Sequence, residues 1–139
     1  MSELERAKAL LEEGKFTLAL VKGGVRITSK ERGVRPLLRL IQEERDVRSY
    51  AAADRVVGRA AAFLYVLLGV KEVYAKVISK LAEEVLLGHG IAVFCGTRTE
   101  RIRSYAGGYC PMETAVEHCE DAESALAAIL KRLAELNKQ

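Results

Sequence analysis

The spacing of apolar residues predicts an amphipathic helix at each end of the chain. Between positions 4 and 13, Leu and Ala recur at helical spacing, and Gly14 then offers a left-handed stop. Asp121 is expected to cap a long final helix. The apolar stripe of that helix consists of Leu126, Ile129, Leu130, Leu133 and Leu136.

Two short β-prone runs follow the first helix. Phe16–Val21 and Val25–Ser29 are separated by Gly23-Gly24, a dipeptide that supplies the positive φ angles of a hairpin turn. These runs are expected to pair as antiparallel strands. Pro36 then opens a short helix, and a loop is expected to continue to about Ala53.

The middle of the chain predicts a buried helix. Asp54 is interpreted as its N-cap, and the residues that follow, from 56 to 68, leave almost no polar face. Gly58 is unfavourable within a helix, which indicates that another backbone or a ligand approaches closely there. Gly69 ends the helix and Val70–Ile78 alternates as a strand.

A strand, helix, strand order then predicts a parallel pair. Ser79 caps a helix that runs to Gly88, and Ile91–Cys95 has the length and apolar character of a strand buried on both faces. Together with the hairpin, these elements predict one α/β domain over residues 1–139. The expected fold is a three-layer α/β/α sandwich around a mixed sheet of about four strands.

The stretch Gly107–Glu113 is the richest in candidate chemistry. Pro111 suits the first position of a helix, so Cys110 precedes a helix start, where a thiolate is favoured. Gly107 and Gly108 leave room for a ligand, and Glu113 is interpreted as a carboxylate that complements the positive end of the helix.

Charge and composition exclude several classes of protein. The net charge is only +3, although 13 of the 22 basic residues are arginine, so the chain lacks the positive excess typical of nucleic-acid binders. No apolar run is long enough for a membrane span, and the acidic N-terminus predicts a cytoplasmic protein without a signal peptide. Three cysteines without a CxxC pair indicate reduced thiols. Cys110 and Cys119 are expected on one helix, too far apart for a disulfide.

Three motifs carry a resemblance to a known family. Ala53–Ala62, Gly69–Ala75 and Cys110-Pro111-Met112-Glu113 occur in the order found in the prokaryotic family called domain of unknown function 1893, which the chain resembles over nearly its whole length. The resemblance implies a cytidine deaminase-like fold. It implies no activity, because the family is uncharacterised.

The residues argue against zinc-dependent deamination. Such deaminases need H-x-E or C-x-E at the start of the buried helix and P-C-x-x-C at the next helix start. The corresponding places read Asp54-Arg55-Val56 and Ile78–Ala82, and neither contains a thiolate or imidazole. His118-Cys119-Glu120 lies elsewhere and has no P-C-x-x-C after it. We therefore expect no metal site and no cofactor.

Three functions remain open at this point. The first is binding of a small anionic ligand, a nucleotide or phosphorylated metabolite, in a cleft between the Asp54 helix start and the Gly107–Glu113 loop. The second is a cysteine-dependent enzyme or redox protein using Cys110, assisted by Asp54 or Glu113, and the third is a non-catalytic homo-oligomeric interaction module. The candidate ligand-binding residues are Arg55, Gly58, Gly107, Gly108, Met112 and Glu113.

Overall fold

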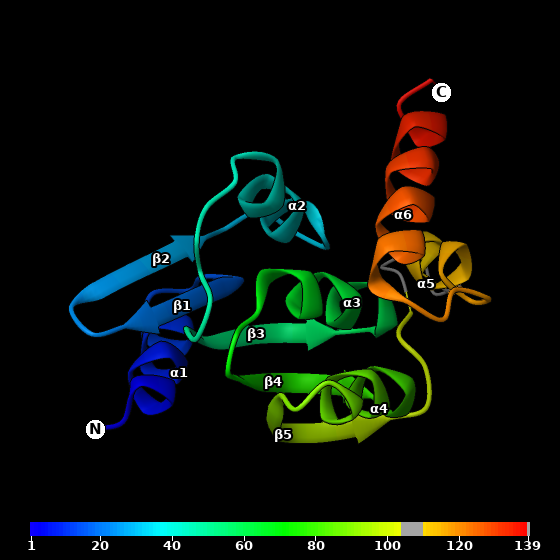
Figure 1. The fold of residues 1–139 in the computed structure, drawn as a ribbon. Coiled ribbons are helices and arrows are strands. Elements are labelled where there is room, and N and C mark those ends of the chain that lie inside the picture. Colours follow the sequence, from blue (N-terminus) through cyan, green and yellow to red (C-terminus); the bar gives the residue numbers. More distant parts are fainter. Residues whose placement is uncertain (104–109, 139) are drawn as a thin grey trace.

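The computed structural model describes residues 1–103 and 110–138 and contains a five-stranded mixed sheet in the order β2-β1-β3-β4-β5 (Figure 1). β1 (Leu18–Lys22) pairs antiparallel with both β2 (Val25–Ser29) and β3 (Ala51–Val57). β4 (Glu72–Ser79) and β5 (Ala92–Thr99) continue the sheet parallel to β3. The predicted α/β fold class is confirmed, with one strand more than the four expected.

Helices cover both faces of this sheet. α1 packs on β1 and β3 on one face, whereas α3 forms the centre of the other layer and contacts α2, α4 and α6. Figure 1 shows the C-terminal part of α6 extending away from the sheet. The helices are α1 (Glu3–Glu13), α2 (Arg35–Gln42), α3 (Arg59–Leu68), α4 (Lys80–Gly88), α5 (Pro111–Ala115) and α6 (Ala122–Leu136).

β3 is the strand that the apolar pattern did not reveal, and the expected loop to about Ala53 is wrong. Ala51, Ala52 and Ala53 are fully buried, with Ala52 in the core beneath α3 and Ala53 in the core beneath α1. Alanine is depleted in strands, so a run of three gave no β signal. Its small side chain instead lets a layer approach closely on each face of the sheet.

Asp54 lies inside β3, so its prediction as a helix N-cap is also wrong. It pairs with Leu18 of β1 and Ala75 of β4. The helix begins five residues later, at Arg59, with Gly58 in the N-cap position and in an extended conformation. Asp is unfavourable in strands and common at helix N-caps. Because Asp54 precedes an apolar run, the sequence indicated a cap and not a strand.

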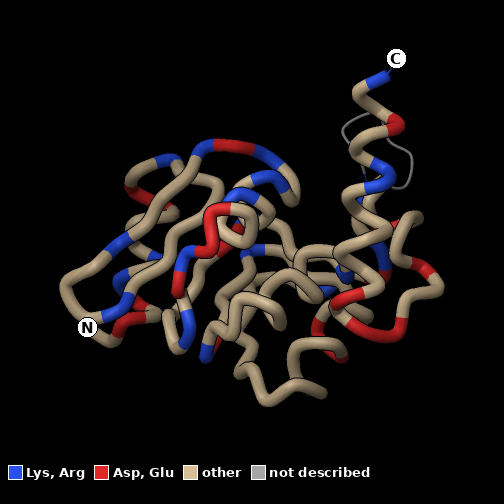
Figure 2. Tube along the Cα trace, turned by 45° about the horizontal axis from the view of Figure 1, so that its top comes forward, with Lys and Arg blue, Asp and Glu red and all other residues tan. Residues whose placement is uncertain are grey.

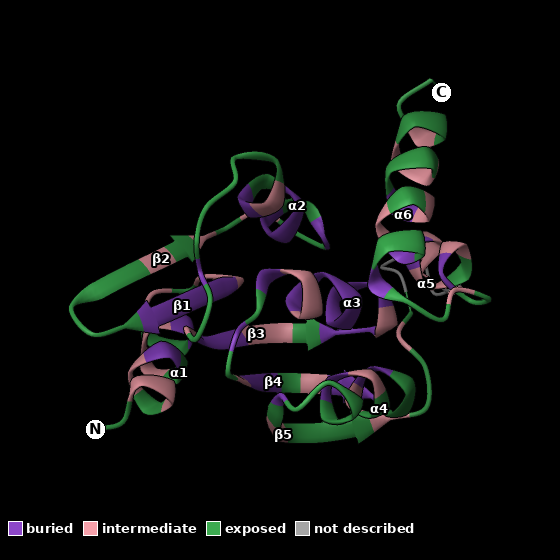
Figure 3. Ribbon diagram, viewed as in Figure 1, coloured by how far each residue is buried: buried purple, intermediate pink, exposed green. Residues whose placement is uncertain are grey.

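Edge and end positions account for three further corrections. β5 is an edge strand with Phe94 50% exposed, so it is not buried on both faces (Figure 3). Gly14 was predicted to end α1 in a left-handed conformation, but it is right-handed. The left-handed residue is the next one, Lys15, at φ 57°. α5 ends at Ala115, so the longer helix expected to carry Cys119 does not form.

The other caps follow the sequence closely. Ser79 accepts a hydrogen bond from the Ala82 amide, and Asp121 accepts one from the Ser124 amide at 2.7 Å. Gly69 ends α3 with φ 72°. The stripe of α6 is only partly enclosed, because Ile129 is fully buried whereas Leu130 is 40% exposed.

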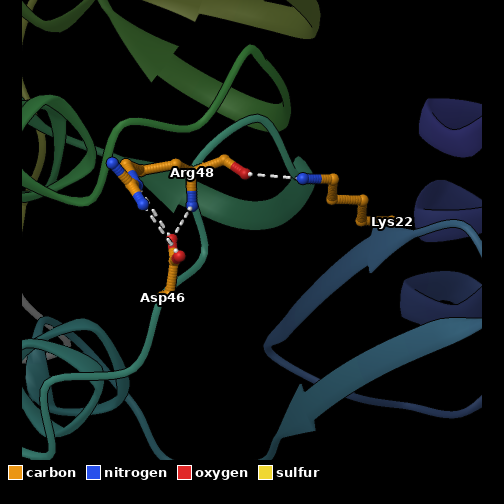
Figure 4. A network of polar contacts seen from close by, with 3 residues as sticks. All are labelled: Lys22, Asp46 and Arg48. Atoms are coloured by element: carbon orange, nitrogen blue, oxygen red, sulfur yellow. Dashed lines mark hydrogen bonds and ion pairs between the residues drawn. The ribbon is translucent and has the colours of Figure 1, made fainter.

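A polar network holds the connection between α2 and β3 against the far end of β1 (Figure 4). The Arg48 guanidinium donates to both carboxylate oxygens of Asp46 at 3.0 Å, and the Lys22 ammonium donates to the Arg48 carbonyl at 3.5 Å. The hydrogen bonds from Arg48 lower the pKa of Asp46 to about 2. This network lies at the opposite end of β1 from the site described next.

Candidate functional site

A pocket of about 890 Å³ opens at the carboxyl end of β3. The first residue of β1, Leu18, pairs with Asp54, so β3 continues three residues beyond this pair, to Val57. The segment before β1, the connection from β2 to α2, the start of α3 and the α5 region form the walls. Ligands of open α/β sheets bind outside the carboxyl ends of the strands, which is where this pocket lies.

Asp54 lines this pocket, and the pKa of its carboxyl group is raised. Tyr65, which is fully buried in α3, donates its hydroxyl to Asp54 Oδ2 at 2.6 Å. Burial raises the pKa of Asp54 to about 7, although hydrogen bonds from Tyr65 and from the Val56 and Arg55 amides act in the opposite direction. Asp54 can therefore exchange a proton near neutral pH.

Glu113 closes the start of α3. Its carboxylate accepts from the Arg59 amide at 2.6 Å and from the Ala60 amide at 2.8 Å. A Cβ on Gly58 would overlap this carboxylate, so Gly58 is closely approached, but by a side chain and not by the backbone or ligand that the sequence indicated. The prediction that Glu113 serves its own helix is therefore wrong. Glu113 instead provides the N-terminal cap that Gly58 cannot give to α3.

The contact between α3 and α5 is reciprocal. The Arg59 guanidinium donates to the carbonyl of Val116 at 2.7 Å and to that of Glu117 at 3.3 Å, just after the end of α5. A cation satisfies the carbonyl end of one helix while a carboxylate satisfies the amide end of the other. This pairing fixes the wall of the pocket that carries Cys110 and Met112.

Arg55 supports the opposite wall. Its Nε donates to the Phe16 carbonyl at 2.6 Å and its Nη2 donates to the Leu11 carbonyl, at the end of α1, at 2.9 Å. These two bonds fix the position of the guanidinium, and Arg55 is one of the residues that line the pocket. A guanidinium has five N–H donors, so these two bonds leave donor capacity for an anion.

Two lysines extend the basic side of the pocket around Phe16. Lys15 and Lys30 both line it, and the Lys30 ammonium lies 5.6 Å from the centre of the Phe16 ring. The hydroxyl of Thr17 lies 2.5 Å from the Glu31 carbonyl and 3.0 Å from the Ser29 carbonyl and shares its one proton between them, which ties the end of β2 to the segment before β1. Nothing in the spacing of Lys15 and Lys30 along the chain singled them out, because only the hairpin brings them together.

The pocket brings together six of the predicted site residues. They are Asp54, Arg55, Gly58, Cys110, Met112 and Glu113. Gly107 and Gly108 lie outside the described residues. Cys110 is half-buried and takes the N-cap position of α5 without a side-chain capping bond, whereas Met112 is buried in the main core.

Sequence comparison places the chain in a family. The family model described as domain of unknown function (DUF1893) matches residues 6–133. The chain belongs to this family. A DUF1893 family protein from Thermotoga maritima, solved by crystallography at 2.70 Å, has a similar structure, with a TM-score of 0.85 at 25% sequence identity. The match covers 94% of this chain and 89% of that one.

A second solved structure is similar only in part. It is a diaminohydroxyphosphoribosylaminopyrimidine deaminase/5-amino-6-(5-phosphoribosylamino)uracil reductase, also from Thermotoga maritima. Its TM-score is 0.43 at 16% identity, over 68% of this DUF1893 chain and 35% of the other chain. A search of curated proteins found no match.

Two absences concern the part of this DUF1893 chain that the structure describes. Residues 1–103 and 110–138 contain no group of three or more His, Cys, Asp or Glu side chains arranged to hold a metal ion. Within the same ranges, no helix combines the length and the apolar character that crossing a membrane requires.

Proposed function

We propose that this protein binds a small anionic molecule, a nucleotide or a phosphorylated metabolite, in the pocket at the end of β3. The observation that carries the proposal is the combination of one enclosed carboxyl group, Asp54, with the basic residues Lys15, Lys30 and Arg55 around a single hollow. Ligand sites typically pair an apolar concave surface with a few placed polar groups.

The size and lining of the pocket support this proposal. Its volume of about 890 Å³ falls in the range of small-molecule sites. Apolar side chains, including those of Val34, Pro36, Ile102 and Met112, provide surface for a ring or a carbon chain. Figure 2 shows basic and acidic residues interspersed along the trace, with the two signs not separated into different parts of the molecule.

The proposal includes a cytidine deaminase-like fold without zinc-dependent deamination. The three-layer arrangement, with parallel strands followed by helices α3 and α4, supports the first part. The residues at the two helix starts support the second, because they read Gly58-Arg59-Ala60 and Ser79-Lys80-Leu81 and contain neither a thiol nor an imidazole. Elemental analysis that finds stoichiometric zinc in the purified protein would contradict this part.

Ligand screening tests the proposal directly. Thermal shift and amide NMR titrations are carried out with inorganic phosphate, sugar phosphates and nucleoside monophosphates. A binder at 100 times its Kd raises the free energy of unfolding by about 2.7 kcal/mol, and the shifted amides should include those around Asp54, Gly58 and Glu113. The proposal fails when the whole panel leaves both the melting temperature and these amides unchanged.

Cys110 supports a second candidate, a thiol-dependent activity, because its half-buried side chain lines the same pocket. The lining residues that the structure describes include no histidine to act as its base, although Asp54 is a proton acceptor within the same pocket. Alkylation kinetics decide this candidate. Cys110 should react with iodoacetamide faster than Cys95 and Cys119, and equal rates for the three thiols would eliminate it.

A further inference from the structure

The pocket has two chemically different ends. The lining residues Lys15, Lys30 and Arg55 belong to the side of α1 and the β hairpin, where the Arg55 guanidinium donates to the Leu11 carbonyl and the Lys30 ammonium lies over Phe16. The lining residue Asp54 accepts a hydrogen bond from Tyr65 on the side of α3. Arg55 and Asp54 are neighbours in β3, so their side chains point to opposite faces of the strand. Arg55 reaches the end of α1, and Asp54 reaches Tyr65 of α3.

The start of α3 is not available to an anion. Helix N-termini commonly bind phosphate through free amides, but the Glu113 carboxylate already accepts from the Arg59 and Ala60 amides. A ligand anion near these amides would also meet the negative charge of Glu113. The side formed by Lys15, Lys30 and Arg55 also includes Glu31, but the carboxylate of Glu31 is paired with Arg39 at 2.6 Å. Of the sides described here, this one is therefore suited to hold the anionic part of a ligand.

Asp54 sets the chemistry of the other end. Its carboxyl is held by Tyr65 and by neighbouring amides in surroundings where a charge is poorly solvated. A ligand N–H group that donates to this carboxyl would replace missing water and stabilise the ionised form. A ligand carbonyl or phosphate at the same place would be repelled by that form.

Resting on the binding function proposed above, we propose that the ligand is bipolar, with a phosphate against Lys15, Lys30 and Arg55 and an N–H donor against Asp54. Phosphorylated compounds with an amino or amidine group at the other end belong to this class. Simple sugar phosphates lack the donor, and polyamines lack the anion.

Two nucleotides that differ by one donor test the proposal. Adenosine 5′-monophosphate carries an amino group on its base, and purine riboside 5′-monophosphate lacks that group but is otherwise the same. The adenosine compound should bind the full chain about tenfold or more tightly by calorimetry, because a hydrogen bond to a charged acceptor is lost in its partner. Asp54→Asn should remove most of this difference.

A pair of lysine variants tests the anionic end. Lys30→Gln should weaken both nucleotides by a similar factor, severalfold or more at low salt. Lys22→Gln is the matched control. The Lys22 ammonium lies 5.9 Å from the ring centre of Tyr50, as the Lys30 ammonium lies 5.6 Å from that of Phe16. Lys22, however, is at the other end of β1, away from the pocket. Lys22→Gln should leave both affinities unchanged.

The pH dependence of binding provides a readout that a structural role would not move. The donor favours ionised Asp54, so adenosine 5′-monophosphate should bind more weakly as the pH falls below about 7. The phosphate itself titrates near pH 6, and this contribution is the same in Asp54→Asn. The difference between wild type and variant therefore reports Asp54 alone.

The other titratable groups of the lining are Lys15, Lys30, Glu31, Arg32, Arg55, Arg103, Cys110 and Glu113, and Tyr65 contacts Asp54 from α3.

Each end of the proposal can fail separately. Equal affinities for the two nucleotides, unchanged in Asp54→Asn, would overturn the donor end and leave the anion-binding function in place. Equal affinities of Lys30→Gln and Lys22→Gln would overturn the anionic end. Failure of adenosine 5′-monophosphate to bind while sugar phosphates bind would contradict the bipolar ligand, whereas failure of every phosphate tested would contradict the binding function itself.

Discussion

The Glu113 carboxylate occupies the space that a side chain at position 58 would need, and Gly58 is the residue that leaves this space open. Gly58 is at the start of α3 and Glu113 is in α5, and together they replace an ordinary N-cap. A glycine N-cap has no side chain that accepts hydrogen bonds from the first amides. Glu113 supplies that acceptor from a distant part of the chain.

Gly58→Ala should destabilise the protein by about 1 to 3 kcal/mol, because the new methyl group overlaps the Glu113 carboxylate and forces it away from the α3 amides. Chemical denaturation measures the change. Gly88→Ala is the control, since a Cβ there meets open space at the end of α4 and should be neutral or stabilising. Equal effects of the two substitutions would contradict the proposed contact.

Glu113→Ala should cost about 1 to 2 kcal/mol through loss of the cap. In the double variant with Gly58→Ala the two costs should not add, because the methyl group no longer meets a carboxylate. A double-mutant cycle measures this coupling. Strict additivity would show that the two positions act independently.

Asp54→Asn should change how stability depends on pH. Because the pKa of Asp54 is raised to about 7 in the folded state, the folded protein binds more protons than the unfolded chain between about pH 4 and 7. This group therefore lowers the free energy of unfolding as the pH rises through that window, by on the order of a few kcal/mol. The variant should gain stability relative to wild type over the same window, measured by urea titration at several pH values. A constant difference would rule out the raised pKa.

Arg55→Met should destabilise the protein by about 1 to 3 kcal/mol and loosen α1 in particular. It removes the donors to the Leu11 and Phe16 carbonyls, which become unsatisfied in a part-buried place. Amide hydrogen exchange should show faster opening of the last turn of α1 than of α4. Uniform acceleration across the chain would indicate a general loss of stability instead.

Local signals predicted much of the fold. Turn glycines, caps and apolar periodicity indicated the hairpin, α1, α2, α4 and α6 with small errors at their ends. The sequence did not predict β3, because its polar pair, Asp54-Arg55, resembles a helix start when only the chain order is known. Distant groups in the helices on the two faces of the sheet satisfy both side chains: the hydroxyl of Tyr65 and the carbonyl of Leu11.

The candidate site was predicted in part for a similar reason. Asp54, Gly58 and Cys110 carry chemistry or conformational constraints that are visible one residue at a time, and the structure places all three around one pocket. Lys15, Lys30 and Tyr65 are ordinary residues until the hairpin and α3 bring them to that pocket. Glu113 was assigned to the end of its own helix because the separation of 54 residues from Arg59 hides its partner.

The cap that Glu113 gives to α3 also bears on synthesis of the protein. A nascent chain emerging from the ribosome can form the β3-α3-β4 unit well before residue 113 has been made. During that interval the first turn of α3 presents its amides to solvent, and the pocket lacks a wall. Completion of the pocket therefore waits until residue 113 has been made.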